Sequence, residues 1–227
     1  MRLKNLIIGD VKFQVKYGFY FIFAVIVVFY ICLLYIFKEA WREKAATVMI
    51  FSDPAAMGMF FMGAIVLLEK SQRVLDSIAV SPVKVSEYIF GKVISIGSIS
   101  AIVALIIALA AGMGNYVMLT VATFFGSALF TLIGLIVSTR INSLNQFVIA
   151  TVPFEIICFL PPIAYLFGYG NDWFLFHPGT SLICMINGDF SHLLLNIVVL
   201  TVWLVLLMIF TKKVVKKMFS SVGGVKL

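Results

Sequence analysis

Charged residues are scarce in this sequence. They make up 12% of its 227 residues, whereas hydrophobic residues make up 63% and the mean hydropathy is +1.13. A soluble domain needs roughly a quarter of its residues charged to cover its surface. The scarcity of charge therefore excludes a large soluble domain, an enzyme domain included, and favours a single all-α integral membrane domain over residues 1–227.

Cysteine and histidine are also sparse. The three cysteines, Cys32, Cys158 and Cys184, lie far apart, which excludes a disulfide framework and a cysteine metal site. His177 and His192 are single residues near the predicted outer face. We therefore expect no metal site.

Catalytic motifs are absent too. Gly91-Lys92 resembles the end of a nucleotide-binding loop, but position 86 is serine where such a loop has its first glycine. The sequence has no zincin motif, no nucleophile elbow and no catalytic pair of carboxylates. We expect no catalytic residue, no cofactor bound by this chain and no enzymatic activity of its own.

Long uncharged runs separate the few charges. A transmembrane helix needs about 20 apolar residues, and the run of 47 uncharged residues from 93 to 139 is divided by a turn signal at Gly112–Asn115. The pattern predicts six spans, at 17–37, 48–68, 93–112, 117–138, 147–167 and 191–211. In the second span, Ser52-Asp53-Pro54 has the pattern of a helix start with Asp53 as N-cap, so its helix is expected to begin as late as Pro54.

Basic residues are distributed unevenly among the connecting segments. With the N-terminus inside, 14 of the 17 Lys and Arg residues lie in cytoplasmic segments, and only Lys38, Arg42 and Lys44 lie outside. Lys and Arg concentrate on the cytoplasmic side of membrane proteins, so both termini are expected in the cytoplasm and the chain in the plasma membrane. The anionic inner leaflet accounts for the net charge of +7 without a nucleic-acid partner.

The N-terminal segment, residues 1–16, is amphipathic. Leu3, Ile7, Val11 and Val15 recur every four residues. This spacing predicts a helix that lies in the membrane interface and leads into the first span.

Residues 168–190 are too long and too apolar for a simple outer turn. Pro178-Gly179 interrupts them, and Ser181–Ile186 suits a short helix. We predict a partly re-entrant segment between the fifth and sixth spans, covered by protein or lining a wet cavity.

Small residues follow one face of the third predicted span. Gly97, Ala101, Ala104 and Ala108 recur at spacings of four, three and four. Because small residues let membrane helices approach closely, we predict that this face packs tightly against another helix.

Glu155 stands near the middle of the fifth predicted span. An intramembrane carboxylate is costly unless it faces protein or water, and two interpretations remain. Glu155 contacts a substrate or a proton along a transport path, or it is structural and bonds to backbone groups freed by Pro153 and Pro161-Pro162.

The one long cytoplasmic loop, residues 69–92, has the pattern of a structured segment. Val74, Leu75 and Ile78 give a short helix an apolar edge, and Ser81-Pro82 ends it. A short helix held between two membrane helices can pass a partner's movement to the bundle. The alternative is a solvated loop whose charges only determine the topology.

The order of residues in this loop resembles that in the permease subunits of type-2 ABC exporters. In that family an acidic residue ends the second span, and a Gly-Thr-Leu-Glu-like helix, Thr/Ser-Pro and Gly-Lys follow. The matching residues here are Glu69, Leu75, Asp76, Ser81, Pro82, Gly91 and Lys92, whereas Arg73-Val74 replaces Gly-Thr. The resemblance extends to the interfacial helix, the six spans and the outer segment around His177–Thr180.

The resemblance implies partners for this chain. Two permease subunits, identical or paralogous, pair in the membrane, and each docks residues 71–80, the coupling helix, onto a separate ATPase subunit that binds ATP and Mg. The residues implied in coupling are Glu69, Arg73, Leu75, Asp76, Ile78, Ser81 and Pro82. Family members export diverse substrates, and the narrow apolar bundle favours a hydrophobic drug, a peptide or a lipid.

Two other functions remain open on the sequence. An ion-coupled secondary transporter would use Glu155 and a proton or sodium gradient, although no repeat relates the two halves of the chain. A membrane scaffold or immunity protein would bind a partner through the inner loop without transport.

Overall fold

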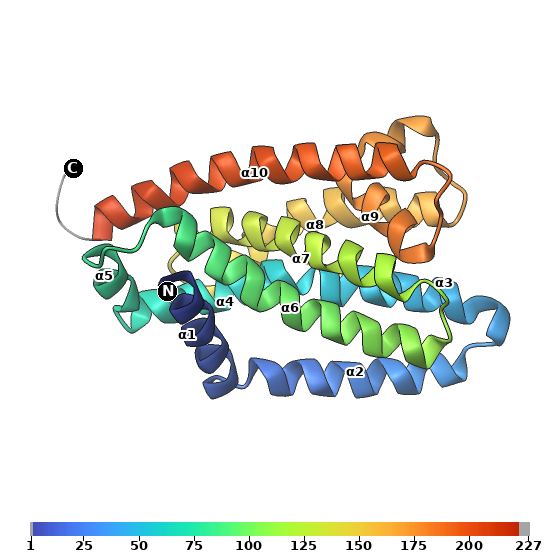
Figure 1. Ribbon diagram of the computed structural model, residues 1–227, viewed down its shortest axis with the longest axis horizontal. Coiled ribbons are helices and arrows are strands. Elements are labelled where there is room, and N and C mark those ends of the chain that lie inside the picture. The colour runs from blue at the N-terminus through green and yellow to red at the C-terminus, as the bar shows by residue number, and fades with distance from the viewer. Residues whose placement is uncertain (1, 223–227) are drawn as a thin grey trace.

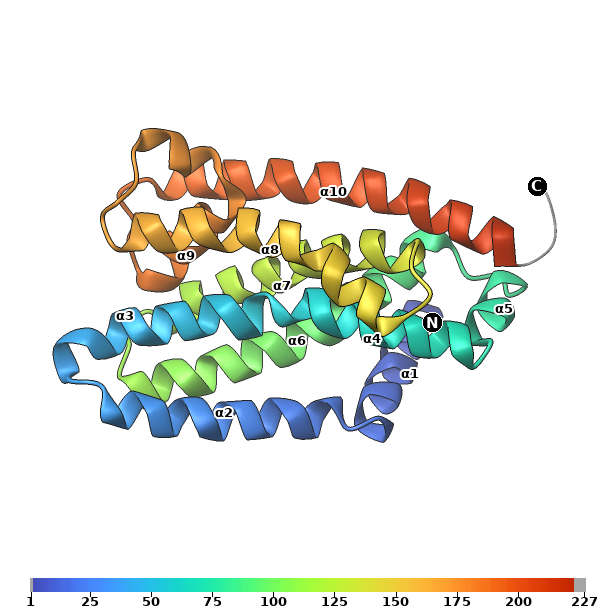
Figure 2. The ribbon, with the colours of Figure 1, turned by 180° about the vertical axis from the view of Figure 1, so that it is seen from behind.

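The computed structural model describes residues 2–222, which form helices and short connecting segments with no strand among them. Six helical segments are long and apolar enough to cross a membrane, which confirms the prediction of an all-helical protein with six spans. They are α2 (Phe19–Ile36), the run α3–η1–α4 (Glu39–Ser71), α6 (Val85–Ala111), α7 (Tyr116–Thr139), α8 (Leu144–Leu166) and α10 (Leu193–Val222). All six run along the long axis of the molecule (Figure 1, Figure 2).

Short helices occupy the two ends of this bundle. At one end lie α1 (Arg2–Lys16), α5 (Val74–Ala79) and the last turns of α10, and we call this the α5 end (Figure 1). At the other lie the 3-10 helix η2 (Asp172–Phe176) and α9 (Pro178–Asn187), and we call this the α9 end. Gly18 has a positive φ of 78°, which lets the chain turn from α1 into α2.

The second spanning segment differs from its prediction. Its helix begins in α3 (Glu39–Ile50), continues through the π-helix η1 (Phe51–Ala55) and ends in α4 (Met57–Ser71). Ser52-Asp53-Pro54 is therefore not a helix start, and Asp53 is not an N-cap. Proline has no N–H to donate to the carbonyl four residues earlier, so it interrupts the α-helical ladder, and here the helix accommodates it by widening over one turn.

Two helices extend beyond the spans predicted for them. α6 begins at Val85 rather than at residue 93. The backbone N–H of Lys84 donates to Oε2 of Glu87 over 2.8 Å, and this half of a capping box stabilises the earlier start. α10 continues to Val222 rather than ending at residue 211, so its lysine-rich last turns remain helical.

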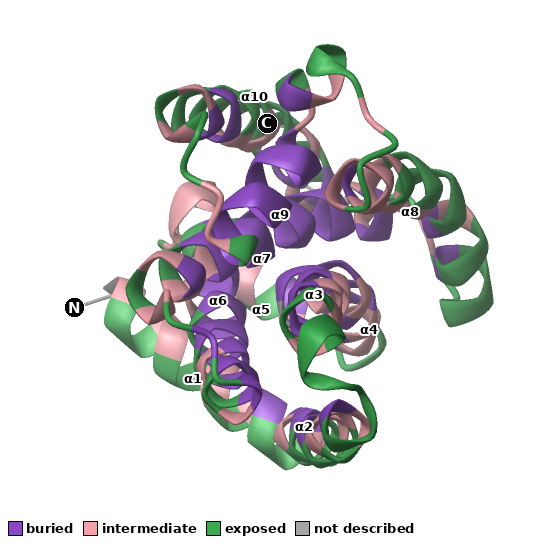
Figure 3. Cartoon of the chain, turned by 90° about the vertical axis from the view of Figure 1, so that its right-hand side faces the viewer, coloured by how far each residue is buried: buried purple, intermediate pink, exposed green. Residues whose placement is uncertain are grey.

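The core of the bundle lies around α7, with α4 and α6 packed against it. Seen from the α9 end, buried residues gather on α6, α7 and α9, whereas α2, α8 and α10 expose much of their surface (Figure 3). In a membrane, the exposed apolar surface of these peripheral helices faces lipid or another protein.

Two glycines bring α4 and α7 together. A Cβ atom at Gly134 of α7 would lie 2.6 Å from the carbonyl oxygen of Met59 on α4. A Cβ atom at Gly58 of α4 would lie 2.8 Å from the carbonyl oxygen of Ser127 on α7. Neither position has room for a side chain, so the backbones pack almost directly against each other.

The small face predicted on the third span lies on α6. Gly97 accommodates the ring of Phe124 from α7, because a Cβ atom there would lie 2.9 Å from the ring. Ala104 and Ala108 are fully buried, and Ala101 is 9% exposed. The small residues thus lie along the side of α6 that the neighbouring helices cover.

Candidate functional site

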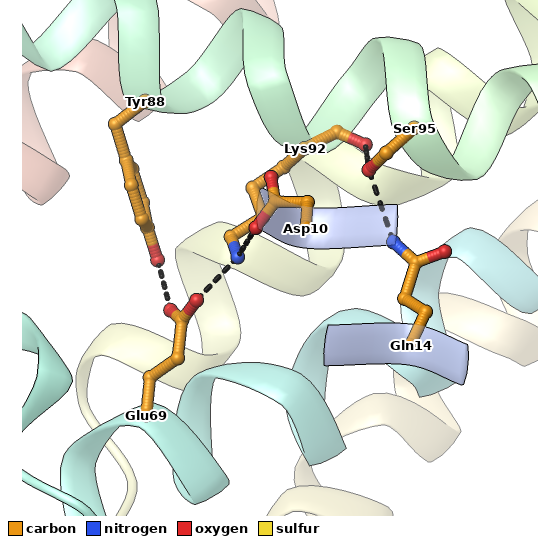
Figure 4. Close-up of polar contacts among 6 residues, drawn as sticks. All are labelled: Asp10, Gln14, Glu69, Tyr88, Lys92 and Ser95. Carbon is orange, nitrogen blue, oxygen red and sulfur yellow. Dashed lines mark hydrogen bonds and ion pairs between the residues drawn. The ribbon is translucent and has the colours of Figure 1, made fainter. Parts of the chain in front are cut away.

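A buried group of four side chains joins three helices near the α5 end (Figure 4). The ammonium of Lys92 on α6 is bonded to the carboxylates of Asp10 on α1 and Glu69 on α4. The hydroxyl of Tyr88 donates to Oε2 of Glu69 over 2.7 Å. We call Asp10, Glu69, Tyr88 and Lys92 the Lys92 cluster.

Helical spacing brings these residues together. Tyr88 and Lys92 lie one turn apart on α6, and Asp10 and Gln14 lie one turn apart on α1, so each pair faces the same side of its helix. Beside the cluster, Nε2 of Gln14 donates to the hydroxyl of Ser95 over 3.0 Å (Figure 4). α1 is therefore attached to α6 by two polar contacts one turn apart.

Burial makes the charges of the cluster depend on one another. Lys92 is 1% exposed and Glu69 is 3% exposed. Burial raises the pKa of Asp10, the nearby Lys92 acts against this rise, and the charge of Glu69 adds to it. Two carboxylates share one ammonium, so the loss of Lys92 would leave both acids buried without a counter-charge.

The segment predicted as a coupling helix contains the helix α5. Leu75 is 1% exposed and belongs to the hydrophobic core, and α5 contacts both α4 and α10. Asp76 is exposed, and Val80, directly after the helix, is 82% exposed. Of the residues predicted for coupling, Glu69 and Leu75 are thus buried: Leu75 packs α5 into the core, and Glu69 bonds Tyr88 and Lys92 of α6.

The remaining predicted coupling residues lie at the ends of α5. Arg73 is exposed and has a φ of 55°, and it is the only non-glycine residue with a positive φ in the described part of the chain. Glycine suits this left-handed conformation best, and the resemblance described above predicts glycine at this position. After the helix, the Ser81 hydroxyl donates to the carbonyl of the half-buried Ile78 over 2.7 Å, and Pro82 is exposed.

Lys70 has a structural role that sequence reasoning missed. Its Nζ donates to the carbonyl oxygens of Ser138, Thr139 and Ile141 over 2.8, 3.3 and 2.8 Å. Carbonyls at a helix C-terminus lack partners within the helix, so Lys70 caps α7 from the end of α4. The sequence signal that could have indicated this role is a basic residue just after the end of the second predicted span.

Glu155 lies at the midpoint of α8, equally far from Leu144 and Leu166. Its Oε1 atom is buried and has no hydrogen-bond partner among residues 2–222. The carbonyl of Ile157, which Pro161 leaves free, is bonded by His177 instead. No hydrogen bond thus joins Oε1 of Glu155 to the backbone that the prolines free among these residues, and the structure gives the interpretation as a structural carboxylate no support.

The segment predicted to lie outside, residues 168–190, contains a short buried helix, α9 (Pro178–Asn187), which packs against α7, α8 and α10. Nδ1 of His177 accepts a hydrogen bond from the Gly179 N–H over 3.1 Å and caps this helix. Burial lowers the pKa of His177, and its hydrogen bond with the Ile157 backbone acts in the opposite direction.

An apolar groove of about 900 Å³ runs between α6, α7 and α10. Its lining includes Phe90, Met118 and Met208, and Lys212 stands at the α5 end. A second, smaller pocket of about 390 Å³ lies between η1, α4 and α8 and includes Glu155. No group of three or more His, Cys, Asp or Glu side chains within the described ranges could hold a metal ion.

Comparisons with known proteins agree on one family. Residues 1–222 match the family model described as the Fluoroquinolones export permease protein family. Two Mycobacterium tuberculosis proteins, from strains CDC 1551 / Oshkosh and ATCC 25618 / H37Rv and both named fluoroquinolones export permease proteins, are 30% identical to this chain over 129 residues. The aligned region covers 56% of this chain and 54% of each relative, so the chain spans about half the length of the curated relatives it matches.

Proposed function

We propose that this chain, which belongs to the Fluoroquinolones export permease protein family, couples through α5 to a separate ATPase subunit and moves a hydrophobic or amphipathic substrate outward across the plasma membrane. Membership of the family makes it an ABC-type permease subunit with six membrane-spanning helices. In this proposal ATP and Mg bind to the ATPase subunit rather than to this chain.

The observation that carries the proposal is the way the loop containing α5 is closed at its base between α4 and α6. Leu75 anchors one edge of α5 in the core, and Val80 beside it stays exposed. Glu69 before the loop and Lys92 after it are joined by a buried ion pair, so the loop is closed at its base. A partner that moves α5 therefore moves both membrane helices rather than a flexible connection.

The proposal puts the α5 end in the cytoplasm, together with both termini. The distribution of Lys and Arg supports this orientation. On α1, Ile8 and Val15 are 41% and 57% exposed, while the polar Asp10 and Gln14 face the bundle, which supports a helix lying in the membrane interface. At the α9 end, Trp173 is 80% exposed and suits the headgroup level; α9 is the partly re-entrant element of this proposal.

The proposed unit contains two permease subunits, either two copies of this chain or one copy and a paralogous permease. The exposed apolar surfaces of α2 and α8 leave room for such pairing. The apolar lining of the two pockets, together with the name of the matching family, supports a small hydrophobic or amphipathic substrate, a drug, a peptide or a lipid.

Purification of the tagged chain from its own membranes in mild detergent tests the proposal. We expect a stoichiometric protein with a phosphate-binding loop to travel with it, and the pair to export substrate from proteoliposomes only with ATP. Reproducible absence of that ATPase, with gradient-driven transport that Glu155→Gln abolishes, would replace the proposal with an ion-coupled transporter. A bound partner without any transport would instead indicate a scaffold or immunity protein.

A further inference from the structure

The pocket around Glu155 is built from two membrane helices. Ser52 of η1 and Phe60 of α4 line one side, and Glu155 and Phe159 of α8 line the other. Figure 2 shows α8 beside the run α3–η1–α4, and α4 and α8 are in contact. The volume of about 390 Å³ is within the range of small-molecule sites, roughly 300–1,000 Å³.

The carboxylate of Glu155 is unsatisfied in this pocket. Its Oε1 atom is buried and has no partner in the part of the chain that the structure describes. Buried polar atoms normally have a hydrogen-bond partner, and a carboxylate at the middle of a spanning helix is costly without one. The missing partner is therefore expected to come from outside this chain.

The π-helix adds a second acceptor to the pocket. The Ser52 hydroxyl donates its proton to the Met49 carbonyl over 3.2 Å, so the oxygen can only accept from a ligand. Ser52 lies in the π-helix η1, and π-helices of this kind occur frequently at functional sites. Glu155 and Ser52 together offer acceptors and no donor.

Two aromatic rings complete the lining. Phe159 is held in place by Phe130, stacked at 5.7 Å, and by Phe51, edge-on at 5.4 Å. Aromatic faces carry partial negative charge and attract cations. Among the residues whose side chains are described, no Lys or Arg lines the pocket, so its polar and aromatic groups favour a positive charge.

We propose that this pocket binds an amphipathic organic cation, with the positive centre against Glu155 and the apolar body against Phe60 and Phe159. Ile156 and Leu160 at the rim are 52% and 62% exposed, so the pocket opens on the surface of the bundle and a ligand enters it from the membrane. The description of this cation as the exported substrate rests on the proposed function; the binding site does not.

A binding experiment with two isosteric ions tests the site. The purified chain in nanodiscs, without any ATPase or ATP, is titrated with radiolabelled tetraphenylphosphonium, a cation, and with tetraphenylborate, an anion of the same shape. We expect Glu155→Gln to weaken tetraphenylphosphonium binding at least tenfold and not to weaken tetraphenylborate binding, because the loss of a negative charge removes attraction only for the cation. Phe60→Leu should weaken cation binding several-fold, because it removes a ring face but no charge.

The control variant is Glu43→Gln, which removes an exposed carboxylate of α3 and should bind both ions as the native chain does. Thermal unfolding of each variant in detergent establishes that it is folded. Native-like tetraphenylphosphonium binding by folded Glu155→Gln would overturn the proposal, as would equal losses for both ions. If cation binding depends on Glu155 but no ATPase pairs with the chain, the binding site stands and the proposed function fails. If an ATPase pairs with the chain and drives export but cation binding does not depend on Glu155, the proposed function stands and the binding site fails.

Discussion

The ammonium of Lys92 on α6 is bonded to the carboxylate of Glu69 on α4, and both side chains are buried. The two residues flank the loop that contains α5, one at its beginning and one beyond its end. The pair therefore closes the base of the loop, and Asp10 attaches α1 to the same point. The ammonium of Lys92 thus connects α1, α4 and α6 at the base of the loop that contains α5.

Removal of Lys92 tests the importance of this pair. Lys92→Met leaves the buried Glu69 and the partly buried Asp10 without a counter-charge, and we expect a loss of about 3–5 kcal/mol in the free energy of unfolding. Thermal unfolding in detergent, followed by tryptophan fluorescence, measures the change.

Two controls accompany this variant. Glu69→Gln should cost less than Lys92→Met, because one carboxylate and one ammonium remain. Lys12→Met, at an exposed position of α1, should stay within about 0.5 kcal/mol of the native chain. If Lys92→Met unfolds no earlier than Lys12→Met, the cluster does not hold the α5 end together.

Because α4 and α7 approach closely, a single methyl group added at Gly134 should lower the stability of the protein strongly. In Gly134→Ala, the new Cβ would meet the Met59 backbone, which cannot move aside as a side chain would. We expect a loss of about 1–3 kcal/mol. Gly114→Ala is the matched control, because nothing lies within 4 Å of its Cβ position; equal unfolding temperatures for the two variants would contradict the packing described.

The positive φ of Arg73 predicts that glycine at this position stabilises the protein. Its left-handed backbone is strained for any residue with a Cβ, so Arg73→Gly should raise the free energy of unfolding by about 1 kcal/mol. Arg73→Ala keeps the Cβ and should give no such gain. A lower stability of the glycine variant would mean that the arginine side chain stabilises the loop by more than the strain costs.

A buried position of α5 and the exposed position directly after it should respond differently to substitution. Val80→Asp alters an exposed position, so the unfolding temperature should hardly change while ATP-driven export by the assembled transporter is lost. Leu75→Ala removes a buried side chain and should cost about 2–5 kcal/mol in stability. Full transport by Val80→Asp would show that this edge is not the docking surface.

His177 makes the stability of the α9 end depend on pH. Its Nδ1 must be unprotonated to accept from Gly179, and burial lowers its pKa below the ordinary value of 6.5. The unfolded chain therefore binds more protons near and below that value, and stability present above it is lost as the pH falls. His177→Asn keeps a capping side chain without titrating, so the unfolding temperature of this variant should change less than that of the native chain between pH 7.5 and 5.5.

More of the fold than of the candidate site could be predicted from the sequence. The six spans followed from uncharged runs, and α5 and α9 from local apolar and proline signals. The π-helix was misread, because Ser-Asp-Pro has the same composition at a helix start as at an interruption within a helix. Glu69 and Leu75 were predicted as coupling residues from the order of residues in the loop, and only the tertiary structure shows that both side chains are buried.

The sequence by itself determined that this chain is a bundle of membrane-spanning helices. In lipid every backbone polar group must be bonded within its own segment, so an uncharged run of sufficient length has to be helical. It did not determine how the helices pair, because a helix apolar on all sides carries no periodicity to orient it. Only the tertiary structure brought Lys92 to two acids and left Oε1 of Glu155 without a partner among residues 2–222, since such contacts depend on close packing between segments distant in the chain.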